Sequence, residues 1–358
     1  MLDIDASMLN KGLLAESQNV ALGDYIIDLA WSPDASKLAA ATVEGAVFLI
    51  DNLGDSAHCK LIGQHAGGAN SLSWRCDGAE FATAGHDGLA KIWDGTSGQE
   101  LSSLEAGDLW VAKTVYSPRR NVLATAAGRH LKLWNERRDA FYESSDHSST
   151  IADVGWNPQG PGIATAANNG FTLHLSDETA EPRKYRWRGS SLVLQWSPDA
   201  KYMVTGEQDA TVHFWYVKSG KNAQMRGFPT KVLALSWDSS GQWLATGAGP
   251  SFLLWDCSGK GPTGRQPRQY DAHSSKLTQL VFQSDGDLLA SADADGFLFL
   301  WDPIQHDKVI GGVLLSSPAS CLRWCKGGKL AVGQQDGNVV VFEVQSGPLK
   351  KDGSRICT

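Results

Sequence analysis

The sequence of 358 residues predicts an all-β protein made of eight similar antiparallel units, each with four strands. Three observations carry this prediction. An aromatic residue that ends an apolar run recurs every 40–45 residues, a turn sequence follows it, and two further apolar runs come next. The recurring aromatic residues, which end the first strand of each unit, are Trp31, Trp74, Tyr116, Trp156, Trp196, Trp237, Phe282 and Trp324.

The clearest copy of the unit covers residues 273–302, with the sequence HSSKLTQLVFQSDGDLLASADADGFLFLWD. Its three apolar runs, LTQLVF, LLASA and FLFLW, are rich in residues that favour strands. Asp285-Gly286 and Asp295-Gly296 separate the runs, and such pairs suit tight hairpin turns. The copy therefore predicts a three-stranded antiparallel meander.

About fifteen residues lie between one meander and the next, which leaves room for a fourth, outer strand. Four-stranded units that stack so that each buries its neighbour's face close radially into a β-propeller. We therefore predict eight blades. The candidate outer strands are residues 59–64, 100–105, 183–188, 222–227, 268–272 and 309–315.

The two ends of the chain predict how the ring closes. Residues 12–17, GLLAES, lie upstream of the first meander in the phase of an outer strand, whereas the tail over 345–358 is polar. We expect the N-terminal segment to supply the outer strand of the last blade, because this would cover an exposed sheet edge. The prediction is one domain over residues 1–358, with repeats over roughly 12–344.

Composition narrows the class of protein. The formal net charge of −7 gives no overall field that would favour nucleic acid or an anionic membrane. The six cysteines show no paired framework, and the N-terminus has neither a signal peptide nor any run long enough to cross a bilayer. We therefore expect a cytoplasmic protein that binds neither nucleic acid nor membrane.

The third strands carry the dipeptides Trp93-Asp94, Trp255-Asp256 and Trp301-Asp302. With these dipeptides in repeats of 40–45 residues, the sequence resembles the WD-repeat (WD40) propeller family over residues 12–344. The resemblance implies that a His, a Ser or Thr, an Asp and the Trp of one repeat form a hydrogen-bonded tetrad. The two full matches are His65, Thr83, Asp87 and Trp93, and His273, Ser291, Asp295 and Trp301.

Two further copies match the tetrad in part. Thr205, Asp209 and Trp215 match with Trp187 in place of the His, and His147, Thr165 and Asn169 match with Leu175 in place of the Trp. The other four copies lack most of the tetrad. This irregularity leaves seven blades plus an appendage as an alternative, while the even spacing favours eight.

A His, an Asp and a Ser in one motif also suggest a hydrolytic triad. The structural interpretation is stronger, because the set recurs in distant copies, its hydroxyl lies inside a strand, and Thr83 stands where the other copy has Ser291. No phosphate-binding loop, nucleophile elbow or zinc-protease motif is found. Cys321 and Cys325 form a CxxxC without a second pair, a weak zinc signal. We therefore predict no catalytic residue, no cofactor and no metal.

Residues 183–188, RKYRWR, mix four basic residues with two aromatic ones, as grooves for single-stranded nucleic acid do. The segment also falls on a predicted outer strand, where Lys and Arg commonly protect a sheet edge from pairing with other chains. We favour edge protection, because the whole protein is acidic. An acidic protein partner is the third interpretation.

The resemblance further implies that the loops leading into the first strands, and the turns between second and third strands, share one face around the channel that grips peptides. An exposed aromatic in a polar surround makes a plausible binding centre. Trp110 is the most informative of these positions; its alternative role is packing against the neighbouring blade. The predicted partner-binding residues are Tyr25, His86, Trp110, Gln208, Lys231, Lys276 and Gln335.

We therefore expect a non-catalytic scaffold that binds a peptide or protein over the channel face and acts as a subunit of a larger complex. Lys231 and Lys276 predict an acidic residue in the partner. The alternative is a propeller that binds a small ligand or metal, or an enzyme that uses the central channel.

Overall fold

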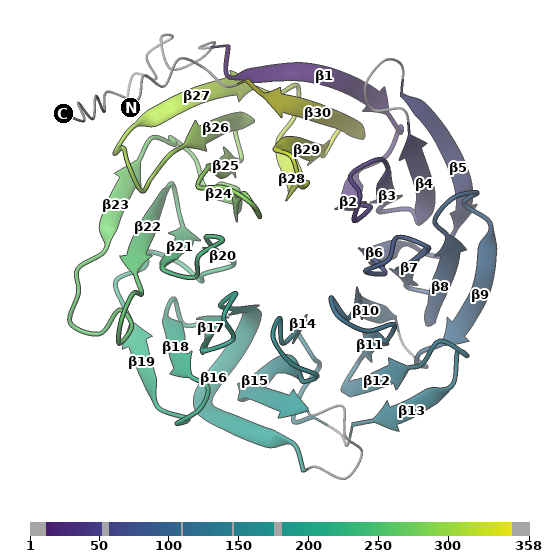
Figure 1. Ribbon diagram of the computed structural model, residues 1–358, viewed down its shortest axis with the longest axis horizontal. Helices are drawn as coiled ribbons and strands as arrows, with labels where there is room; N and C mark the ends of the chain where they lie inside the picture. Colours follow the sequence, from purple (N-terminus) through teal and green to yellow (C-terminus); the bar gives the residue numbers. More distant parts are fainter. Residues whose placement is uncertain (1–11, 52–56, 109, 145–146, 175–180, 346–358) are drawn as a thin grey trace, which may run out of the picture.

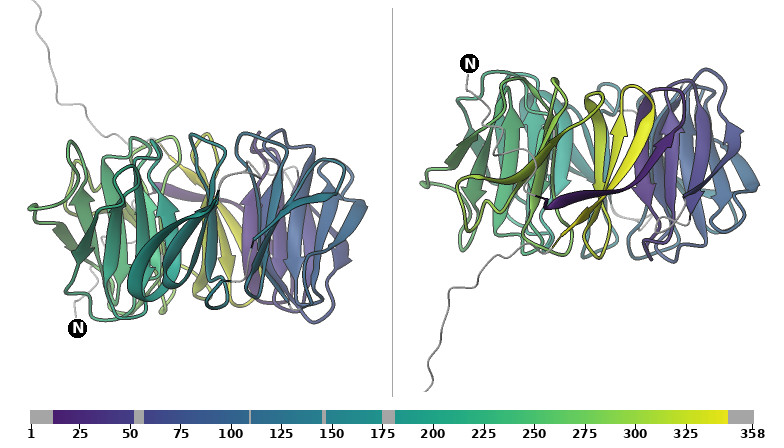
Figure 2. Two further views of the ribbon diagram at one scale, coloured as in Figure 1. Left: turned by 90° about the horizontal axis from the view of Figure 1, so that it is seen from below. Right: turned by 90° about the horizontal axis from the view of Figure 1, so that it is seen from above.

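The computed structural model describes residues 12–51, 57–108, 110–144, 147–174 and 181–345. Within these ranges thirty β-strands form sheets arranged radially around a central channel (Figure 1). The two side views show a thick disc whose strands run between its two faces (Figure 2). In the described part of the chain, no helix is long and apolar enough to cross a membrane. The predicted all-β propeller is confirmed.

Six of the sheets have the predicted four antiparallel strands. In the first, β2 (Ile26–Trp31) lines the channel, β3 (Leu38–Thr42) and β4 (Ala46–Asp51) follow outward, and β5 (His58–Gln64) lies at the rim. The second strands are the most enclosed, and every residue of β3 is buried. The same order holds in β6 (Ala69–Trp74), β7 (Glu80–Gly85), β8 (Leu89–Asp94) and β9 (Glu100–Glu105); in β10 (Val111–Tyr116), β11 (Leu123–Ala127), β12 (His130–Trp134) and β13 (Ala140–Glu143); in β20 (Ala234–Trp237), β21 (Trp243–Ala248), β22 (Ser251–Asp256) and β23 (Arg268–Asp271); and in β24 (Leu277–Phe282), β25 (Leu289–Asp293), β26 (Phe297–Trp301) and β27 (Val309–Leu314).

The ring closes as the chain ends suggested. β28 (Ala319–Trp324), β29 (Lys329–Gln334) and β30 (Asn338–Val344) are completed by β1 (Leu14–Ala21), which pairs antiparallel with β30 along its length. A bulge between Glu16 and Gln18 interrupts the register, and there the Ser17 hydroxyl donates to the Val341 carbonyl at 3.0 Å. Figure 2 shows β1 lying along the outside of β30. The N-terminal segment therefore covers the outer edge of the last sheet.

The predicted count of eight blades is wrong, because the propeller has seven sheets. The seventh contains β14 (Asp153–Trp156), β15 (Ile163–His174), β16 (Arg183–Trp196), β17 (Tyr202–Glu207), β18 (Val212–Tyr216) and β19 (Asn222–Met225). We call this six-stranded sheet the double blade. The first half of β16 pairs with β15, and the second half of β16, from Ser191 onward, pairs with β17. The outer strand of one repeat therefore continues directly into the inner strand of the next.

The double blade also contains a hairpin within β15. Thr165 Oγ1 lies 3.0 Å from His174 Nε2, although nine extended residues would span about 30 Å. The chain reverses at Asn169 and Gly170, which have φ values of 70° and 106°. Glycine is required at the second position, because a Cβ atom there would lie 2.0 Å from the Tyr185 carbonyl oxygen. All eight sequence repeats are thus present, and two of them share one sheet.

The recurring first-strand tryptophans connect neighbouring repeats. The indole N–H of Trp74 donates to the Ala30 carbonyl at 2.9 Å, and that of Trp31 donates to the Arg323 carbonyl at 2.8 Å across the closure of the ring. Trp156, Trp196 and Trp324 make equivalent bonds of 2.9, 3.0 and 3.1 Å. These five bonds satisfy carbonyl groups on the inner strands of neighbouring repeats, and so explain why the sequence favours a tryptophan at this position.

Candidate partner-binding face

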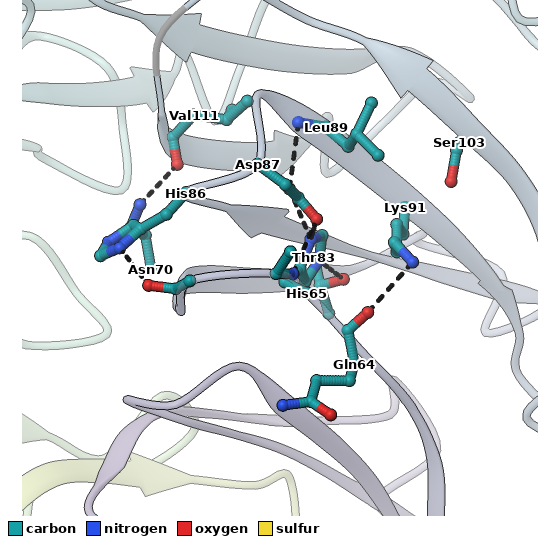
Figure 3. Close-up of polar contacts among 12 residues, drawn as sticks. Gln64, His65, Asn70, Thr83, His86, Asp87, Leu89, Lys91, Ser103 and Val111 are labelled. Carbon is teal, nitrogen blue, oxygen red and sulfur yellow. Dashed lines mark hydrogen bonds and ion pairs between the residues drawn. The ribbon is translucent and has the colours of Figure 1, made fainter.

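The first tetrad fixes the turn between β7 and β8 (Figure 3). Trp93 Nε1 donates to Thr83 Oγ1 at 2.9 Å, and Thr83 Oγ1 lies 2.7 Å from His65 Nε2. His65 Nδ1 lies 2.9 Å from Asp87 Oδ1 and donates to that carboxylate. Burial lowers the pKa of His65, so the ring is neutral and its Nε2 accepts the Thr83 proton. The Thr83 side chain is fully buried, out of reach of any substrate.

The second tetrad uses a different acid from the one predicted. His273 Nδ1 lies 2.7 Å from Asp293 Oδ2, not from Asp295, while Ser291 Oγ contacts His273 Nε2 at 2.7 Å and Trp301 Nε1 at 2.8 Å. Asp295 lies in the exposed turn, where its carboxylate accepts a 3.4 Å bond from Ser274. The Asp295 assignment is therefore wrong.

The residue two places after the buried hydroxyl explains the exchange. In the first tetrad this position is Gly85, and a Cβ atom there would lie 2.1 Å from His65 Nδ1. The absence of a side chain lets Asp87 reach the histidine. In the second tetrad the same position is Asp293, whose own carboxylate fills that space and keeps Asp295 outside.

The same position decides one of the two partial matches in the double blade. Glu207 stands two places after Thr205 and accepts from Thr205 Oγ1 at 2.7 Å and from Ser191 Oγ at 2.8 Å. Burial raises the pKa of Glu207. Asp209, predicted for the tetrad, accepts instead from Thr211 Oγ1 at 2.7 Å. Trp187, in the predicted place of the His, packs on His213 with ring centroids 3.8 Å apart.

In the other partial match, His174 takes the place expected for Leu175, which lies outside the described residues. His147 Nδ1 donates to the Arg129 carbonyl at 2.9 Å, so its Nε2 accepts from Thr165 Oγ1 at 2.8 Å. His174 Nε2 then donates to Thr165, and His174 Nδ1 accepts from the Tyr142 hydroxyl at 2.9 Å. Burial lowers the pKa of His174 to about 3, which agrees with this neutral chain.

Four of the seven predicted partner-binding residues line one pocket at the mouth of the channel. Tyr25, Lys231, Lys276 and Gln335 lie in loops next to strands of four different sheets, and they enclose about 370 Å³ together with the exposed Leu233. We call this the channel-face pocket. Within the described chain, neither Lys231 nor Lys276 has an ion-pair partner, and both are exposed.

His86 and Trp110 lie together elsewhere on the same face. Their ring centroids are 5.3 Å apart, and Trp110 is 55% exposed. His86 is held by the Gly67 carbonyl at 2.7 Å and by Asn70 Oδ1 at 2.9 Å, and the Asn70 amide donates to the Val111 carbonyl (Figure 3). Trp110 therefore contacts the neighbouring blade with one face and leaves much of its surface open to a partner.

Gln208, the last of the predicted partner-binding residues, lies outside the channel-face pocket. Two exposed apolar residues, Val43 and Leu233, were not predicted from the sequence. Gln208 is exposed on the turn after β17, and its backbone N–H donates to the Ser190 carbonyl at 3.0 Å. The exposed Val43 lies beside Tyr25, because its N–H donates to the Tyr25 carbonyl. Leu233, in the pocket, is 46% exposed. Apolar residues in a loop or turn carry too weak a signal to single out.

The channel wall carries charges that the repeat pattern also did not indicate. Arg323 pairs with Asp28 at 2.5 Å, and Lys113 pairs with Asp153 at 3.4 Å. The Asp153 carboxylate raises the pKa of Lys113. Asp28 also accepts from the Leu72 N–H in the next sheet, and Asp153 from the Leu194 N–H. The positive and negative charges cancel within each pair, and each pair joins neighbouring inner strands.

Cys321 and Cys325 are both buried, and burial raises the pKa of Cys321 to about 12. Their thiols are therefore protonated at neutral pH. In the ranges that the structure describes, no three His, Cys, Asp or Glu side chains are grouped so that they could hold a metal ion.

Comparison with known proteins identifies the repeats. The family model for the WD domain, G-beta repeat, matches residues 58–94, 189–216, 222–256 and 264–302. The chain is 24% identical over 87% of its length to telomerase protein component 1 of Rattus norvegicus, but spans only 12% of that protein. It is 24% identical over 73% of its length to pre-mRNA-processing factor 19 homolog 2 of Arabidopsis thaliana, spanning 52% of it. With Arabidopsis cell division cycle 20.5, cofactor of APC complex, identity is 22% over 82% of this chain and 68% of that protein.

Among solved structures, the computationally designed Ika8 protein has the same fold, with a TM-score of 0.77 and 20% identity over 92% of this chain and 99% of that one. The four matched repeats, the tetrads and the closed ring of antiparallel sheets lead to one conclusion. This chain carries WD repeats of the G-beta type and folds as a β-propeller.

Proposed function

We propose that this propeller is a non-catalytic scaffold that binds a peptide or protein segment carrying an acidic residue across the channel face. One observation carries the proposal: residues distant in sequence, from loops next to four different sheets, converge on the channel-face pocket. Convergence of apolar and charged groups in a concave site is typical of recognition surfaces.

The chemistry of the face supports an acidic ligand with an apolar anchor. Lys231 and Lys276 present two positive charges that no described carboxylate neutralises. Leu233 and Tyr25 provide apolar surface in the same pocket, and the exposed Trp110 provides more. Trp110 directly precedes β10, a strand that lies across the channel from β24 in Figure 1. A partner would gain by burying the aromatic surface and by pairing a carboxylate with the lysines.

The relatives support membership in a larger assembly. The name of one describes a cofactor of the APC complex, and that of another a component of telomerase. We propose by analogy that this chain is also a subunit of a complex, with its channel face turned to a partner.

The test is a charge reversal with a matched control. Lys231→Glu with Lys276→Glu should weaken capture of the partner by roughly tenfold, because two attractive charges become repulsive. Lys218→Glu with Lys221→Glu makes the same change in net charge on exposed lysines of the β18–β19 turn. Affinity purification with quantitative mass spectrometry should show partners that the first variant loses and the second retains. If both variants keep every partner, the channel face is not the binding site.

A further inference from the structure

The outer half of β16, residues 183–188, carries a row of exposed cations at the rim of the double blade. Lys184, Arg186 and Arg188 are all exposed and occupy alternate positions of the strand. Alternate side chains point to the same side of a strand, about 7 Å apart. Figure 1 shows β16 running from the outer rim to the inside of the ring, so the row begins at the edge of the molecule. We call the three residues the basic edge.

The three cations have no ion pair or hydrogen bond with any described side chain. Arg183 on the same strand differs, since its guanidinium lies over the Tyr185 ring at 4.7 Å and donates to the Lys218 carbonyl. Because the whole chain has a net charge of −7, three uncompensated positive charges in a row are a local feature. Free cations at a regular spacing can select an anionic ligand of the same spacing.

The two aromatic residues of the segment face inward. Tyr185 is buried and stacked on Phe171 with centroids 4.3 Å apart, and Trp187 packs on His213 at 3.8 Å. Neither ring is free to stack with a nucleobase. Since stacking on aromatic side chains provides much of the affinity for single-stranded nucleic acid, the arrangement favours a protein ligand.

One backbone edge of this segment is open. Arg183, Lys184, Tyr185 and Arg186 pair with β15 on one side. On the other side no described strand pairs with β16 before Ser191, where β17 begins its ladder. An open edge provides backbone donors and acceptors that an added strand can use.

A cavity of about 240 Å³ lies beside the basic edge. Lys184 and Arg186 line it together with the amide side chains of Asn168 and Asn169. His147 and His174 also line it, but both rings are committed to the neutral hydrogen-bond chain through Thr165. Glu181 contributes one negative charge against the two cations. The cavity therefore has a net positive lining with amides that can donate to a carboxylate.

We propose that the open edge of β16 binds an extended peptide segment of a partner protein with acidic residues at alternate positions, as an added antiparallel or parallel strand. The peptide's backbone pairs with residues 183–188, and its carboxylates lie beside Lys184, Arg186 and Arg188 as cross-strand neighbours. Lys184 and Arg186, two of these three cations, also line the cavity. This site is separate from the channel-face pocket and does not depend on it.

The competing interpretation is that the basic edge only prevents strands of other molecules from pairing there. The two interpretations predict different selectivity for added peptide strands. A purely protective edge repels added strands of any pattern, whereas a binding edge discriminates between acidic peptides of equal composition by the spacing of their charges.

The experiment uses the full chain and two fluorescent peptides, TETEVEVT, with Glu at alternate positions, and TTVVTEEE, with the same composition but adjacent Glu residues. We expect the alternating peptide to bind about tenfold more tightly than the other, and Lys184→Glu with Arg186→Glu and Arg188→Glu to reduce its affinity by at least about tenfold. Lys218→Glu with Lys221→Glu and Arg226→Glu, which changes the charge equally at exposed positions, should retain it. Circular dichroism and thermal unfolding verify that both variants fold.

Three results would overturn the proposal. One is equal affinity for the two peptides, and another is an equal loss of affinity for the alternating peptide in both triple variants. Each would indicate that binding depends on net charge and not on the spacing of the charges. The third is tighter binding of a thymidine oligonucleotide than of the alternating peptide, which would indicate a nucleic-acid site. Lys231→Glu with Lys276→Glu should leave this peptide binding unchanged, so that failure of the channel-face proposal can be told apart from failure of this one.

Discussion

Among single residues, the position two places after the buried hydroxyl decides which acid joins the polar network of each repeat. The residue two places after the hydroxyl is Gly85 in one repeat, Asp293 in another and Glu207 in a third. Only the glycine leaves space for the turn aspartate to reach inward. The sequence motif therefore predicts that a polar network exists, but the acid in it depends on a residue outside the motif.

His213 is a buried histidine whose ring is poorly satisfied. It is fully buried on β18, and among the described residues neither ring nitrogen has a hydrogen bond of ordinary geometry, although the Asn222 side chain lies near enough to oppose part of the effect of burial. Burial lowers its pKa to about 4. In the unfolded chain this histidine binds a proton near pH 6.5, whereas in the folded chain it does not. The contribution of His213 to the free energy of unfolding is therefore fully present above pH 6.5 and is lost as the pH falls toward 4.

We predict that His213→Phe stabilises the protein by about 1–3 kcal/mol at neutral pH, since it removes unpartnered polar atoms from the core. The gain should increase at pH 5.5, where the wild type loses stability through this residue. His147→Phe is the control and should destabilise, because His147 uses both ring nitrogens. Urea unfolding at pH 7.5 and 5.5 measures the effect; a loss of stability in His213→Phe would contradict it.

At the scale of the element, the double blade results from a missing loop. Only Gly189 and Ser190 separate the basic edge from Ser191, where pairing with β17 begins, whereas Gln64 and Ala69 in the first two repeats are separated by four residues. With no loop, the outer strand of one repeat runs on as the inner strand of the next. The sequence spacing contained this information, but strand continuity depends on hydrogen bonds that a repeat count does not represent.

The hairpin inside β15 gives a test of this element. Gly170→Ala should destabilise strongly, because its φ is 106° and its Cβ would lie 2.0 Å from the Tyr185 carbonyl oxygen. Gly227→Ala is a matched control, with a φ of 99° and no atom within 4 Å of its Cβ. Both lose roughly 1–2 kcal/mol to backbone strain, but only the first also displaces β16. Thermal unfolding compares them, and equal melting temperatures would argue against the close approach.

At the scale of the whole molecule, the ring is held by contacts between segments distant in sequence. β1 pairs with β30, and the Trp31 indole donates to Arg323 from the other end of the chain. The Asp28–Arg323 pair joins the same two sheets at the channel wall. Closure therefore combines a shared sheet, an indole bond and an ion pair.

Deleting residues 1–21 should lower the melting temperature by roughly 10 °C and promote self-association, because it exposes the edge of β30 with Val339 and Val341. Addition of the peptide LAESQNVA should partly restore the melting temperature, while a scrambled peptide should not. Scanning calorimetry and light scattering provide the measurements. An unchanged melting temperature would show that the closure contributes little.

The all-β class, the repeat length, the N-terminal closure and the members of one tetrad could be predicted from the sequence, because strand periodicity and turn chemistry are local properties. It also indicated Tyr25, Lys231, Lys276 and Gln335, which share a pocket because equivalent repeat positions lie on one face of a ring. Other features depend on the folded ring. The fusion of two repeats, the choice of Asp293, the position of His174 and the inward aromatics of β16 depend on which side chains meet across neighbouring strands, and such contacts are fixed only when the ring closes.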